Sequence, residues 1–487
     1  MPLRLHNTLT KQIDSFTPIG DTVLLYTCGP TVYDHLHVGN WAAYIYWDIL
    51  VRTLHANNLQ TNRVLNITDV GHLVSDEDSG QDKLEKGAQR EKKTAWEIAE
   101  FYAEDFLNGI EKLGLVPPEQ IVRATDFIDE QLDLVRTLRN KDVTYEIDDG
   151  IYFDTTRFPC YADFAGLDLA AQQAGARIGY NEQKRNPADF ALWKFTQPNE
   201  KRDMEWDAPS DLLDDGTAKK GFPGWHLECS AMAMNLLGPT IDIHTGGIDH
   251  IPVHHTNEIA QSECASGQQF SRFWLHNNHL KVNGTKISKS LGNGFTLQDL
   301  QAQGFTPLDF RMFVLQGHYR SEGNFTFDNL TAAKNRLNHW RRIAALRHQL
   351  HSTSAPRQDT TETLPSYAAT QAIVEVLNND LSTPDALRII DETLTALDNA
   401  PANAIDRNAL ITFLESIDEL LGLQLVAVTP DISDENKQVI LERQRAREDG
   451  DWSRSDTLRD QLLEQGIIIH DSKRGSTWSY TDNKYIR

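Results

Sequence analysis

A turn between a short apolar strand and an amphipathic helix constrains the fold of this chain most strongly. Residues 22–26 are apolar and β-branched enough for a buried strand, which Gly29 and Pro30 interrupt. Residues 41–54 then have the periodicity of a helix, and residues 61–68 predict a second strand. Strand, helix and strand in this order form a βαβ unit, which predicts an α/β fold with a parallel sheet.

The same turn has the features of a nucleotide site. His37, Gly39 and Asn40 stand at the predicted start of the helix, where unpaired amides and the helix dipole attract phosphate. A glycine at this place lets a phosphate come close. Cys28 ends the strand, at the edge where open α/β sheets bind ligands. As an isolated pattern, His-x-Gly-Asn is a weak signal.

Composition excludes several classes of protein. The 487 residues, 40% of them hydrophobic, suffice for two to four domains. No apolar run approaches the ~20 residues of a membrane span, and the first ten residues lack the apolar region of a signal peptide. The four cysteines are spaced too widely for a small disulfide scaffold. We therefore expect a cytoplasmic enzyme with reduced thiols and no membrane partner.

Charge limits how this chain could contact nucleic acid. The net charge of −23 argues against indiscriminate binding to a polyanion. Residues 331–350 nevertheless hold five basic and no acidic side chains, and residues 441–487 hold nine of each sign. Charge alone leaves RNA contact and a solvated surface as equal alternatives for both segments. Trp452 and Trp478 also have two possible interpretations. RNA bases could stack on their rings, or the rings could be part of the core.

The remaining pattern predicts further elements along the chain. We expect a β-hairpin at residues 143–154, a helix from about residue 226 and a strand at residues 240–244. Residues 351–364 look like a linker, and residues 466–470 like a short strand. Further helices are expected at 94–113, 119–139, 254–266, 297–317, 327–350 and, in several pieces, 365–423.

Four side chains are candidates for one metal site. Cys28 ends the first strand, and Cys229 lies on the helix that follows residues 223–225. His254 and Glu258 are four apart, which puts them on one helix face. Two thiolates, an imidazole and a carboxylate form a set that suits zinc better than magnesium or calcium. Taken singly, each residue is more often a core cysteine or part of a surface pair.

Two lysines form the second nucleotide motif. Lys286 and Lys289 are three apart in the sequence Lys-Ile-Ser-Lys-Ser, which glycines flank on both sides. On a flexible loop they could close over a triphosphate and follow its charge to the leaving pyrophosphate. Alone, this pattern is also weak, because such runs are common on solvated loops.

In combination and in this order, the motifs resemble those of class I aminoacyl-tRNA synthetases. Residues 37–40 are similar to the His-Ile-Gly-His signature, and residues 286–290 to the Lys-Met-Ser-Lys-Ser loop. Within that class the chain is most similar to the cysteinyl-tRNA synthetases. The similarity runs nearly end to end, through residues 5–10, 28–34, 66–69, 224–231, 242–247, 254–261, 289–293 and 475–478.

The resemblance implies a fold and a domain order. It implies a Rossmann-type parallel-sheet catalytic domain with an inserted connective domain, then a helical anticodon-binding domain and a small α+β C-terminal domain. The expected parts are 1–116 and 221–295 (catalytic halves), 117–220 (insertion), 296–350 (stem-contact helices), 351–364 (linker), 365–435 (anticodon-binding helices) and 436–487 (C-terminal tRNA-recognition domain).

The resemblance also implies an activity. ATP and L-cysteine would form cysteinyl-adenylate, and the cysteinyl group would pass to tRNA(Cys). One zinc ion per chain would be held by Cys28, Cys229, His254 and Glu258 and would select the substrate thiolate over a serine hydroxyl, which pocket shape distinguishes poorly. Four protein ligands ordinarily close a zinc site, so Glu258 is expected to be the weak one. Magnesium would accompany ATP, and the expected state is a monomer.

Site residues follow from matching positions. The residues expected to act in catalysis are His37, Asn40, Lys286 and Lys289. ATP is expected to bind to these four and to Gly39, Gly247 and Asp249. Cysteine is expected to bind to Gly29, Thr68 and Trp225. Asn40 departs from the second histidine of the family. Its amide can donate a hydrogen bond to phosphate but carries no charge. The residues after Asp69 depart as well, with Gly71-His-Leu and an acidic loop at 76–78 before Lys83, where the family often has a further acidic pair and a lysine.

Two alternatives remain open. A cysteine ligase of the mycothiol pathway resembles this catalytic core but passes cysteine to an amino sugar and lacks a full anticodon-binding region, whereas about 120 residues follow the expected linker here. A non-catalytic, zinc-stabilised RNA-binding relative is the alternative from another class. The intact lysine motif argues against it, and Asn40 favours it slightly.

Overall fold

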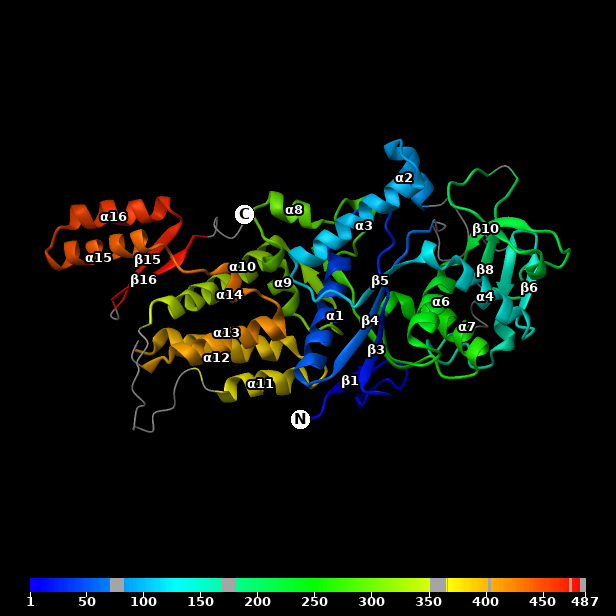
Figure 1. Cartoon of the computed structure of the whole chain (residues 1–487), viewed down its shortest axis with the longest axis horizontal. Coiled ribbons are helices and arrows are strands. Elements are labelled where there is room, and N and C mark those ends of the chain that lie inside the picture. Colours follow the sequence, from blue (N-terminus) through cyan, green and yellow to red (C-terminus); the bar gives the residue numbers. More distant parts are fainter. Residues whose placement is uncertain are drawn as a thin grey trace.

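The computed structural model describes residues 1–70, 83–168, 181–198, 200–350, 365, 367–401, 404–472 and 475–481. The molecule is elongated, with a parallel sheet near its middle, an antiparallel sheet at one end and a small helical domain at the other (Figure 1). The departure predicted after Asp69 falls on residues 71–82, and the predicted linker on residues 351–364; both lie outside the described residues.

The central sheet has five parallel strands in the order β12-β11-β3-β4-β5. Their bounds are Ser271–Asn277, Ile241–Gly247, Thr22–Thr27, Gln60–Ile67 and Gln120–Arg123. The predicted βαβ unit is confirmed, with β3 and β4 joined by α1 (Val38–Ala56). Because β4 and β11 lie on opposite sides of β3, the sheet reverses its order there, and such a point binds ligands at its carboxyl edge.

The prediction of a helix at 119–139 is wrong for its first residues, which form a strand. The four residues of β5 pair with β4 as an outer strand of the central sheet, and α4 begins later, as Ile128–Arg139. A strand this short has too few side chains to show a period of two beside an amphipathic helix. A catalytic half that ends at residue 116 would exclude this strand, so we propose that it extends to Arg123.

A second sheet forms the core of the insertion. It is antiparallel, with the order β6-β7-β8-β10-β9. The bounds are Thr144–Ile147, Gly150–Phe153, Phe190–Phe195, Lys219–Pro223 and Trp206–Ala208. The predicted hairpin at 143–154 is confirmed as β6 and β7. Since β10 pairs within this sheet, we propose that the insertion ends at Pro223 and not at residue 220.

Two helices connect the insertion to the central sheet. They are α6 (Trp225–Leu237) and α7 (Thr256–Ser266), which follows a π-helical turn at Ile251–His255. Leu227 of α6 and Ala260 of α7 pack with Leu132 and Trp193 in the core of the insertion. The π-helical turn and α7 follow the carboxyl end of β11, and Cys229 of α6 packs with Cys28 just beyond the end of β3. The first turns of both helices can therefore line a site there.

The helical region continues the core of the catalytic domain. Its elements are α8 (Leu297–Ala302), α9 (Pro307–Leu315), α10 (Phe327–Ala345), α11 (Tyr367–Leu377), α12 (Thr383–Asn399), α13 (Arg407–Leu421) and α14 (Leu425–Val428). The helix predicted at 297–317 is therefore two helices, because Thr306 caps a new helix with Pro307 as its first residue. Buried Asp48 of α1 pairs with Arg311 of α9, which donates to the Leu421 carbonyl at 2.7 Å.

Shorter elements complete the catalytic region. They are β1 (Arg4–Asn7), β2 (Gln12–Ser15), α2 (Lys83–Glu91), α3 (Ala95–Lys112), β13 (Leu280–Val282) and β14 (Gly323–Phe325). Strands β1 and β2 form a hairpin, and β13 pairs with β14 in parallel. The helix predicted at 94–113 is confirmed as α3, which begins with a capping box between Thr94 and Glu97.

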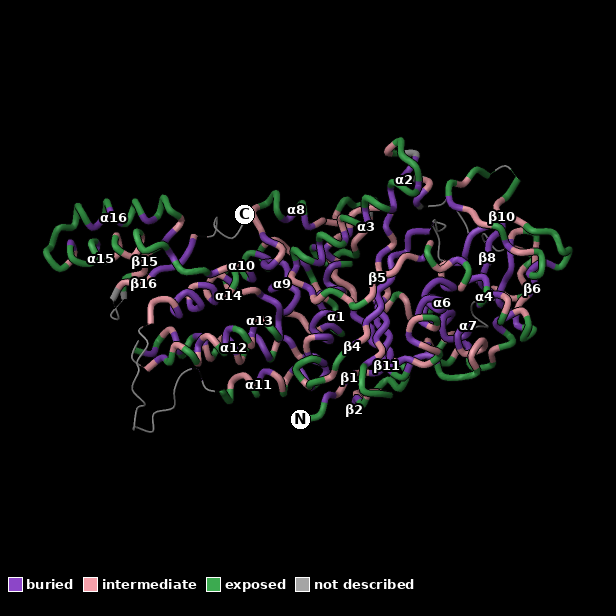
Figure 2. Tube along the Cα trace, in the orientation of Figure 1, coloured by how far each residue is buried: buried purple, intermediate pink, exposed green. Residues whose placement is uncertain are grey.

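The C-terminal domain is a helical hairpin on a β-hairpin. Its elements are α15 (Asp434–Glu448), α16 (Trp452–Glu464), β15 (Ile467–Ser472) and β16 (Gly475–Tyr480). Leu462, Ile467 and Trp478 form its small core, and much of α15 and α16 is exposed (Figure 2). Trp478 is 4% exposed, so the hypothesis that RNA bases stack on its ring is wrong. Trp452 is 59% exposed, and its ring is accessible to a base.

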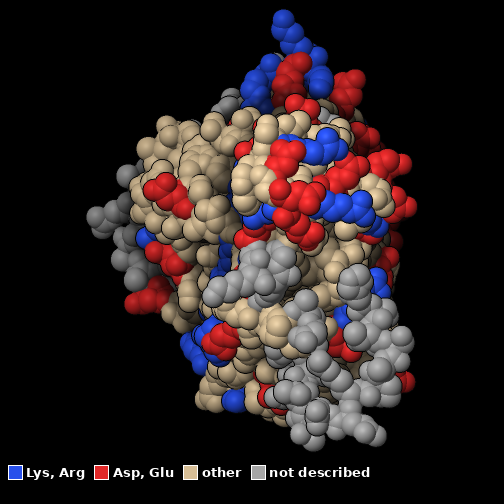
Figure 3. Space-filling view, turned by 90° about the vertical axis from the view of Figure 1, so that its left-hand side faces the viewer, with Lys and Arg blue, Asp and Glu red and all other residues tan. Residues whose placement is uncertain are grey.

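The basic side chains of α10 serve the fold. Arg336 pairs with Asp391, and Arg342 pairs with Asp398 at 2.6 Å, so both tie α10 to α12. Arg347, just beyond the helix, is buried and donates to backbone carbonyls of the segment 426–429. Viewed from the end that carries the C-terminal domain, basic and acidic side chains are interspersed (Figure 3). Among the side chains that the structure describes, the positive charge counted in the sequence therefore forms no separate basic face in this view.

Candidate active site

One cavity collects most of the predicted site residues. It has a volume of about 940 Å³ and lies at the carboxyl edge of β3 and β11. Its lining includes Cys28, Gly29, His37, Gly39, Asn40, Thr68, Trp225, Cys229, Gly247, Asp249, His254 and Lys286. Glu258 is fully buried beneath it, and Lys289 begins a short turn at Lys289–Leu291. The side chain of Lys289 is not among those that the structure describes.

The four predicted metal ligands come together. Ligand atoms of Cys28, Cys229, His254 and Glu258 all lie within 4.8 Å of one another. They come from the end of β3, from α6, from the π-helical turn and from α7. The elements that carry Cys28 and Cys229 are about 200 residues apart in the chain, and the fold brings them to one point. This donor set fits a zinc ion in number and chemistry.

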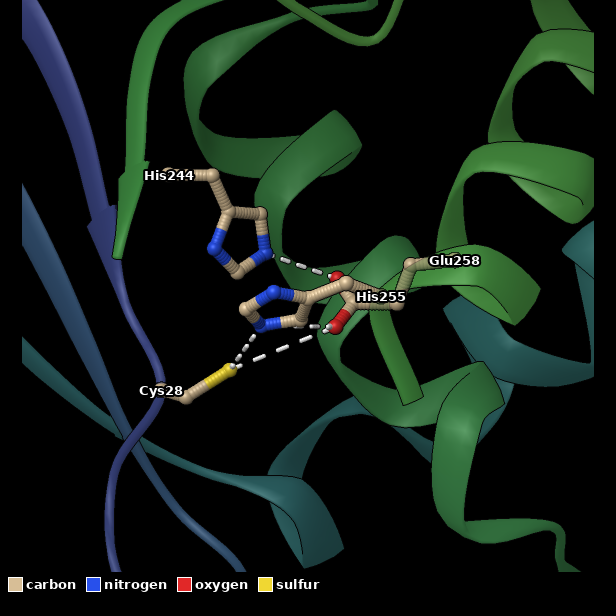
Figure 4. A group of neighbouring side chains, drawn as sticks. All are labelled: Cys28, His244, His255 and Glu258. Carbon is tan, nitrogen blue, oxygen red and sulfur yellow. Dashed lines mark hydrogen bonds and ion pairs between the residues drawn. The ribbon is translucent and has the colours of Figure 1, made fainter. Parts of the chain in front are cut away.

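A second candidate metal set overlaps the first. Cys28 and Glu258 also lie within 4.8 Å of ring nitrogens of His244 and His255. Figure 4 shows this group, with His244 Nε2 at 2.8 Å from Glu258 Oε2 and His255 Nε2 at 3.5 Å from Cys28 Sγ. Sequence reasoning missed both histidines. The available signal was that His244 lies on β11, the predicted strand whose end would stand beside that of β3.

Electrostatics in the cluster reflect burial and close pairing. Burial opposes ionisation of Glu258, but His244 and His254 outweigh it and hold the pKa of this carboxyl well below its usual range. Burial also disfavours charge on His254, yet Glu258 at 2.9 Å raises its pKa to about 10. Burial raises the pKa of Cys28 well above its usual value. A metal ion that binds here must therefore displace protons from Cys28 and His254.

Neighbouring rings orient His254. Its Nδ1 lies 3.0 Å from Nδ1 of His226, and the Trp225 ring centre lies 4.9 Å from its own. A partner on Nδ1 leaves Nε2 directed to the cluster, as is usual for a metal-bound histidine. Trp225 thus lines the cavity beside the metal cluster.

A chain of hydrogen bonds shapes the predicted cysteine pocket. The backbone N–H of Gly29 donates to Asn66 Oδ1 at 2.8 Å, and Asn66 Nδ2 donates to Thr68 Oγ1 at 3.0 Å. Thr68 in turn donates to Glu228 at 3.2 Å. A Cβ atom on Gly29 would collide with the carbonyl oxygen of Asn66, so this position requires glycine. The sequence predicted Gly29 and Thr68 here, but not the roles of Asn66 and Glu228.

The signature turn is built as a helix cap. The His37 ring accepts from the backbone N–H of Asn40, and Asn40 Oδ1 accepts from the backbone N–H of His37, both at 3.2 Å. Asparagine in place of histidine therefore completes a capping box. Gly39 packs closely against residues 286–290, which we call the lysine loop. A Cβ atom on Gly39 would lie 3.0 Å from Ile287 Cδ1.

Asn293 closes the lysine loop through hydrogen bonds to its backbone. It accepts from the backbone N–H of Ser288 at 2.9 Å and donates to the Lys286 carbonyl at 3.2 Å. The segment after the loop pairs with the turn, since the Val38 N–H donates to the Phe295 carbonyl at 2.8 Å. Exposed Lys286 thus lines the cavity that His37 also lines.

Comparisons with known proteins agree with this geometry. The family described as "tRNA synthetases class I (C) catalytic domain" matches residues 16–335, and "Cysteinyl-tRNA ligase anticodon binding domain" matches residues 429–478. The chain belongs to the cysteinyl-tRNA synthetase family. A cysteine–tRNA ligase of Treponema denticola is 38% identical over 506 residues, covering 98% of this chain and 99% of its own. One of Burkholderia lata is 41% identical over 480 residues, covering 98% and 96%.

Solved structures show the class I fold. The methionyl-tRNA synthetase of Mycobacterium tuberculosis in complex with methionyl-adenylate has a TM-score of 0.58 at 15% identity, covering 84% of this chain and 93% of its own. LeuRS of Agrobacterium radiobacter K84 has a TM-score of 0.57 at 12% identity, with 86% of each chain covered. The predicted α/β fold class is confirmed. In the described part of this synthetase-family chain, no helix is long and apolar enough to cross a membrane.

Proposed function

We propose that this chain ligates L-cysteine to tRNA(Cys) in two steps. The carboxylate of cysteine attacks the α-phosphorus of ATP, which forms cysteinyl-adenylate and releases pyrophosphate. A ribose hydroxyl of the terminal adenosine of tRNA then attacks the carbonyl carbon, and AMP leaves. The observation that carries this proposal is that one cavity is lined by the signature turn, the lysine loop and the cysteine–histidine cluster. The full-length relatives are named cysteine–tRNA ligases, which agrees with the overall reaction that these two steps complete.

The cluster is proposed to hold one zinc ion. Cys28, Cys229, His254 and Glu258 would be its ligands, since a set with two thiolates suits zinc better than a set with one. Bound zinc would supply a preference for the substrate thiolate over a serine hydroxyl. Glu258 is the proposed weak ligand, because His244 already donates to its second oxygen. Trp225 and Thr68 would enclose the small side chain of cysteine.

The remaining residues would bind ATP. His37 and the amide of Asn40 would donate to phosphate, while Gly39 leaves room for it. Lys286 and Lys289 would stabilise the charge that develops on pyrophosphate. Gly247 and exposed Asp249 would hold adenosine, and a Cβ on Gly247 would collide with the Asp249 carboxylate. Magnesium would arrive with ATP, as is usual for an ion that binds through phosphates.

The domains beyond residue 295 are proposed to bind tRNA. The helices of residues 296–350 would contact its stem, and those of 365–435 with the domain of 436–487 would reach the anticodon. In the latter, Trp452 is exposed, and the Arg447 guanidinium lies 5.6 Å from its ring centre. An aromatic ring beside a cation suits an unstacked base. A cytoplasmic monomer is proposed.

Two observations separate this proposal from its rivals. The relatives cover this chain nearly completely, and the anticodon-binding description matches residues 429–478, which a mycothiol-type ligase would not need. Lys286 of the lysine motif lines the cavity with the signature residues, which favours an enzyme over a non-catalytic relative.

Cysteine-dependent exchange of pyrophosphate into ATP tests the first step, and charging of purified tRNA(Cys) tests the second. We expect both, with serine as the control amino acid giving neither. Absence of exchange would overturn the enzyme proposal. Exchange without tRNA charging, together with transfer to an amino sugar, would favour the ligase.

A further inference from the structure

A hydrogen-bond chain leads from an N-terminal strand to the metal cluster. Thr8 Oγ1 lies 2.7 Å from Nδ1 of His276, and His276 Nε2 lies 2.7 Å from Nδ1 of His255. The other nitrogen of His255 lies 3.5 Å from Cys28 Sγ. Thr8 follows β1, His276 lies on β12 and His255 ends the π-helical turn. These three side chains thus form a continuous chain of contacts that ends at the Cys28 sulfur.

The outer end of this chain is firmly held. The backbone N–H of Thr8 donates to the Trp274 carbonyl at 2.9 Å. Beside it, the Asn7 side chain donates to the Arg272 carbonyl and accepts from the Trp274 N–H, at 2.9 and 3.1 Å. The Thr8 hydroxyl is therefore fixed in place against β12 by backbone contacts that do not involve the cluster.

Both histidines of the chain are buried, with His255 0% and His276 5% exposed. Burial favours the uncharged form of an imidazole. A neutral imidazole has one N–H, so two arrangements satisfy the contact between the rings. Either Thr8 donates to His276, which donates to His255, whose Nε2–H then faces Cys28, or every donor is reversed and a lone pair faces Cys28.

The first arrangement agrees with a metal-bound cysteine. A metal ligand must be a thiolate, and an N–H directed at a thiolate makes a charge-assisted hydrogen bond. The reversed arrangement would direct a lone pair at the negative sulfur. A threonine hydroxyl can serve as donor at the outer end, whereas an apolar side chain could not.

The hydrogen bonds of His244 also argue against the second metal set. Its Nε2 lies 2.8 Å from the Glu258 carboxylate, so this nitrogen carries the hydrogen. Its Nδ1 is buried and, within the described part of the chain, has no hydrogen-bond partner. If Nε2 bound a metal instead, the hydrogen would move to Nδ1 and remain unsatisfied, which is costly. His254 has no such cost, because His226 faces its Nδ1.

We propose that Thr8 is a positioning residue that, through His276, holds His255 in the tautomer whose Nε2–H donates to the Cys28 sulfur. His255 is then excluded as a ligand, and Cys229 with His254 completes the metal set. This inference rests on the proposed zinc site. It adds a residue of the N-terminal hairpin to the groups that determine which of two overlapping sets binds the ion.

The test reads the tautomer in the full-length, zinc-loaded protein. Two-bond proton–nitrogen correlation spectra of chain labelled with ¹⁵N-histidine distinguish Nε2–H from Nδ1–H, and His255→Gln assigns the signal. We expect Nε2–H in the wild type and in Thr8→Ser. We expect a mixture in Thr8→Val, with transfer of zinc to a chelator about tenfold faster. Thr8→Ser should stay within about twofold of the wild-type rate, as the matched control.

Each outcome decides one question. A wild-type His255 in the Nδ1–H form, with zinc bound at one equivalent, would overturn the role of Thr8 and leave the zinc site standing. Thr8→Val that matches the wild type in both tautomer and zinc release would overturn it as well. A wild-type protein that binds no zinc would instead overturn the zinc site itself, and this inference with it. The wild-type spectrum decides even if Thr8→Val does not fold.

Discussion

His37 and Asn40 cap the first turn of α1 for each other, each side chain accepting the other's backbone N–H at 3.2 Å. The cap commits the Asn40 carbonyl oxygen to the protein, and Asn40 lines the cavity. An amide in this position has its N–H₂ group left for a phosphate oxygen. The substitution that departs from the family signature thus keeps both a structural acceptor and a donor.

Two variants of Asn40 separate these functions. Asn40→Asp keeps a side-chain oxygen that accepts in the cap but removes the N–H₂ donor, so we expect nearly unchanged thermal stability and a higher KM for ATP in pyrophosphate exchange. Asn40→Ala loses the cap as well and should cost about 1 kcal/mol of stability in addition. An unchanged KM in Asn40→Asp would show that the amide does not contact ATP.

Cys229→Ser should remove the metal and the activity together. Serine lacks the thiolate that zinc prefers, and the buried hydroxyl would leave three ligands. We expect elemental analysis to find far less than one zinc per chain and cysteine-dependent exchange to fall at least about 100-fold. Cys264→Ser is the matched control, because this half-buried thiol lies outside both metal sets. Zinc retained in Cys229→Ser would contradict the ligand assignment.

Asp471 should make the C-terminal domain sensitive to acid. Hydrogen bonds from Arg443, with further support from Ser476 and Arg447, hold the pKa of this carboxyl well below its usual range. A lowered folded-state pKa stabilises the domain above about pH 4, and this stabilisation is lost as the pH falls further. Asp471→Asn should therefore unfold the domain more readily at pH 7 and flatten its acid transition, as followed by circular dichroism.

The same variant tests what the C-terminal domain does. We expect Asp471→Asn to charge tRNA poorly while pyrophosphate exchange stays normal, because the cavity lies in the catalytic domain. Asp449→Asn, at an exposed position in the same domain, is the control and should change neither assay. Loss of exchange in Asp471→Asn would show that the domain supports the catalytic fold directly.

Trp452→Ala should weaken tRNA charging alone. A base that stacks on an exposed aromatic ring contributes about 1–3 kcal/mol, so kcat/KM for tRNA should fall about 5- to 150-fold. Exchange should not change. Trp96→Ala removes another exposed tryptophan ring, on α3 and outside the domains proposed to bind tRNA, and should leave both reactions near the wild-type level. Equal charging by the two variants would remove Trp452 from the tRNA interface.

Local patterns predicted most of the secondary structure, and their limits are physical. The βαβ unit around Cys28 has long periodic elements, so its strands and helix were predictable. β5 has four residues and was hidden beside α4. The domain borders depend on strand partners that pair across many residues, as β5 does with β4, and no local pattern contains such a pairing.

The candidate site divides in the same way. Cys28, Cys229, His254 and Glu258 were chosen by donor chemistry and by resemblance, and the fold places their ligand atoms together. The roles of His244, His255 and Thr8 depend on distances between separate elements. The position of His244 on a predicted strand was a signal that could have selected it, but a single sequence gives no reason to select His255 or Thr8. Asn40 was predicted to donate to phosphate without the charge of a histidine, and it also caps the helix, which only the backbone geometry of the turn reveals.

The buried contact of Asp48 with Arg311 has a mechanical consequence. Helix α1 is 19 residues long, which is roughly 28 Å at 1.5 Å per residue. The helix begins at the signature turn. Asp48, in its second half, pairs with Arg311, which donates to a carbonyl at the end of α13. Separating them would strand a buried charge at a cost of about 3–5 kcal/mol. The helix and this buried pair therefore hold the end of α13 at a fixed distance from residues 37–40, so the two parts move as one rigid unit.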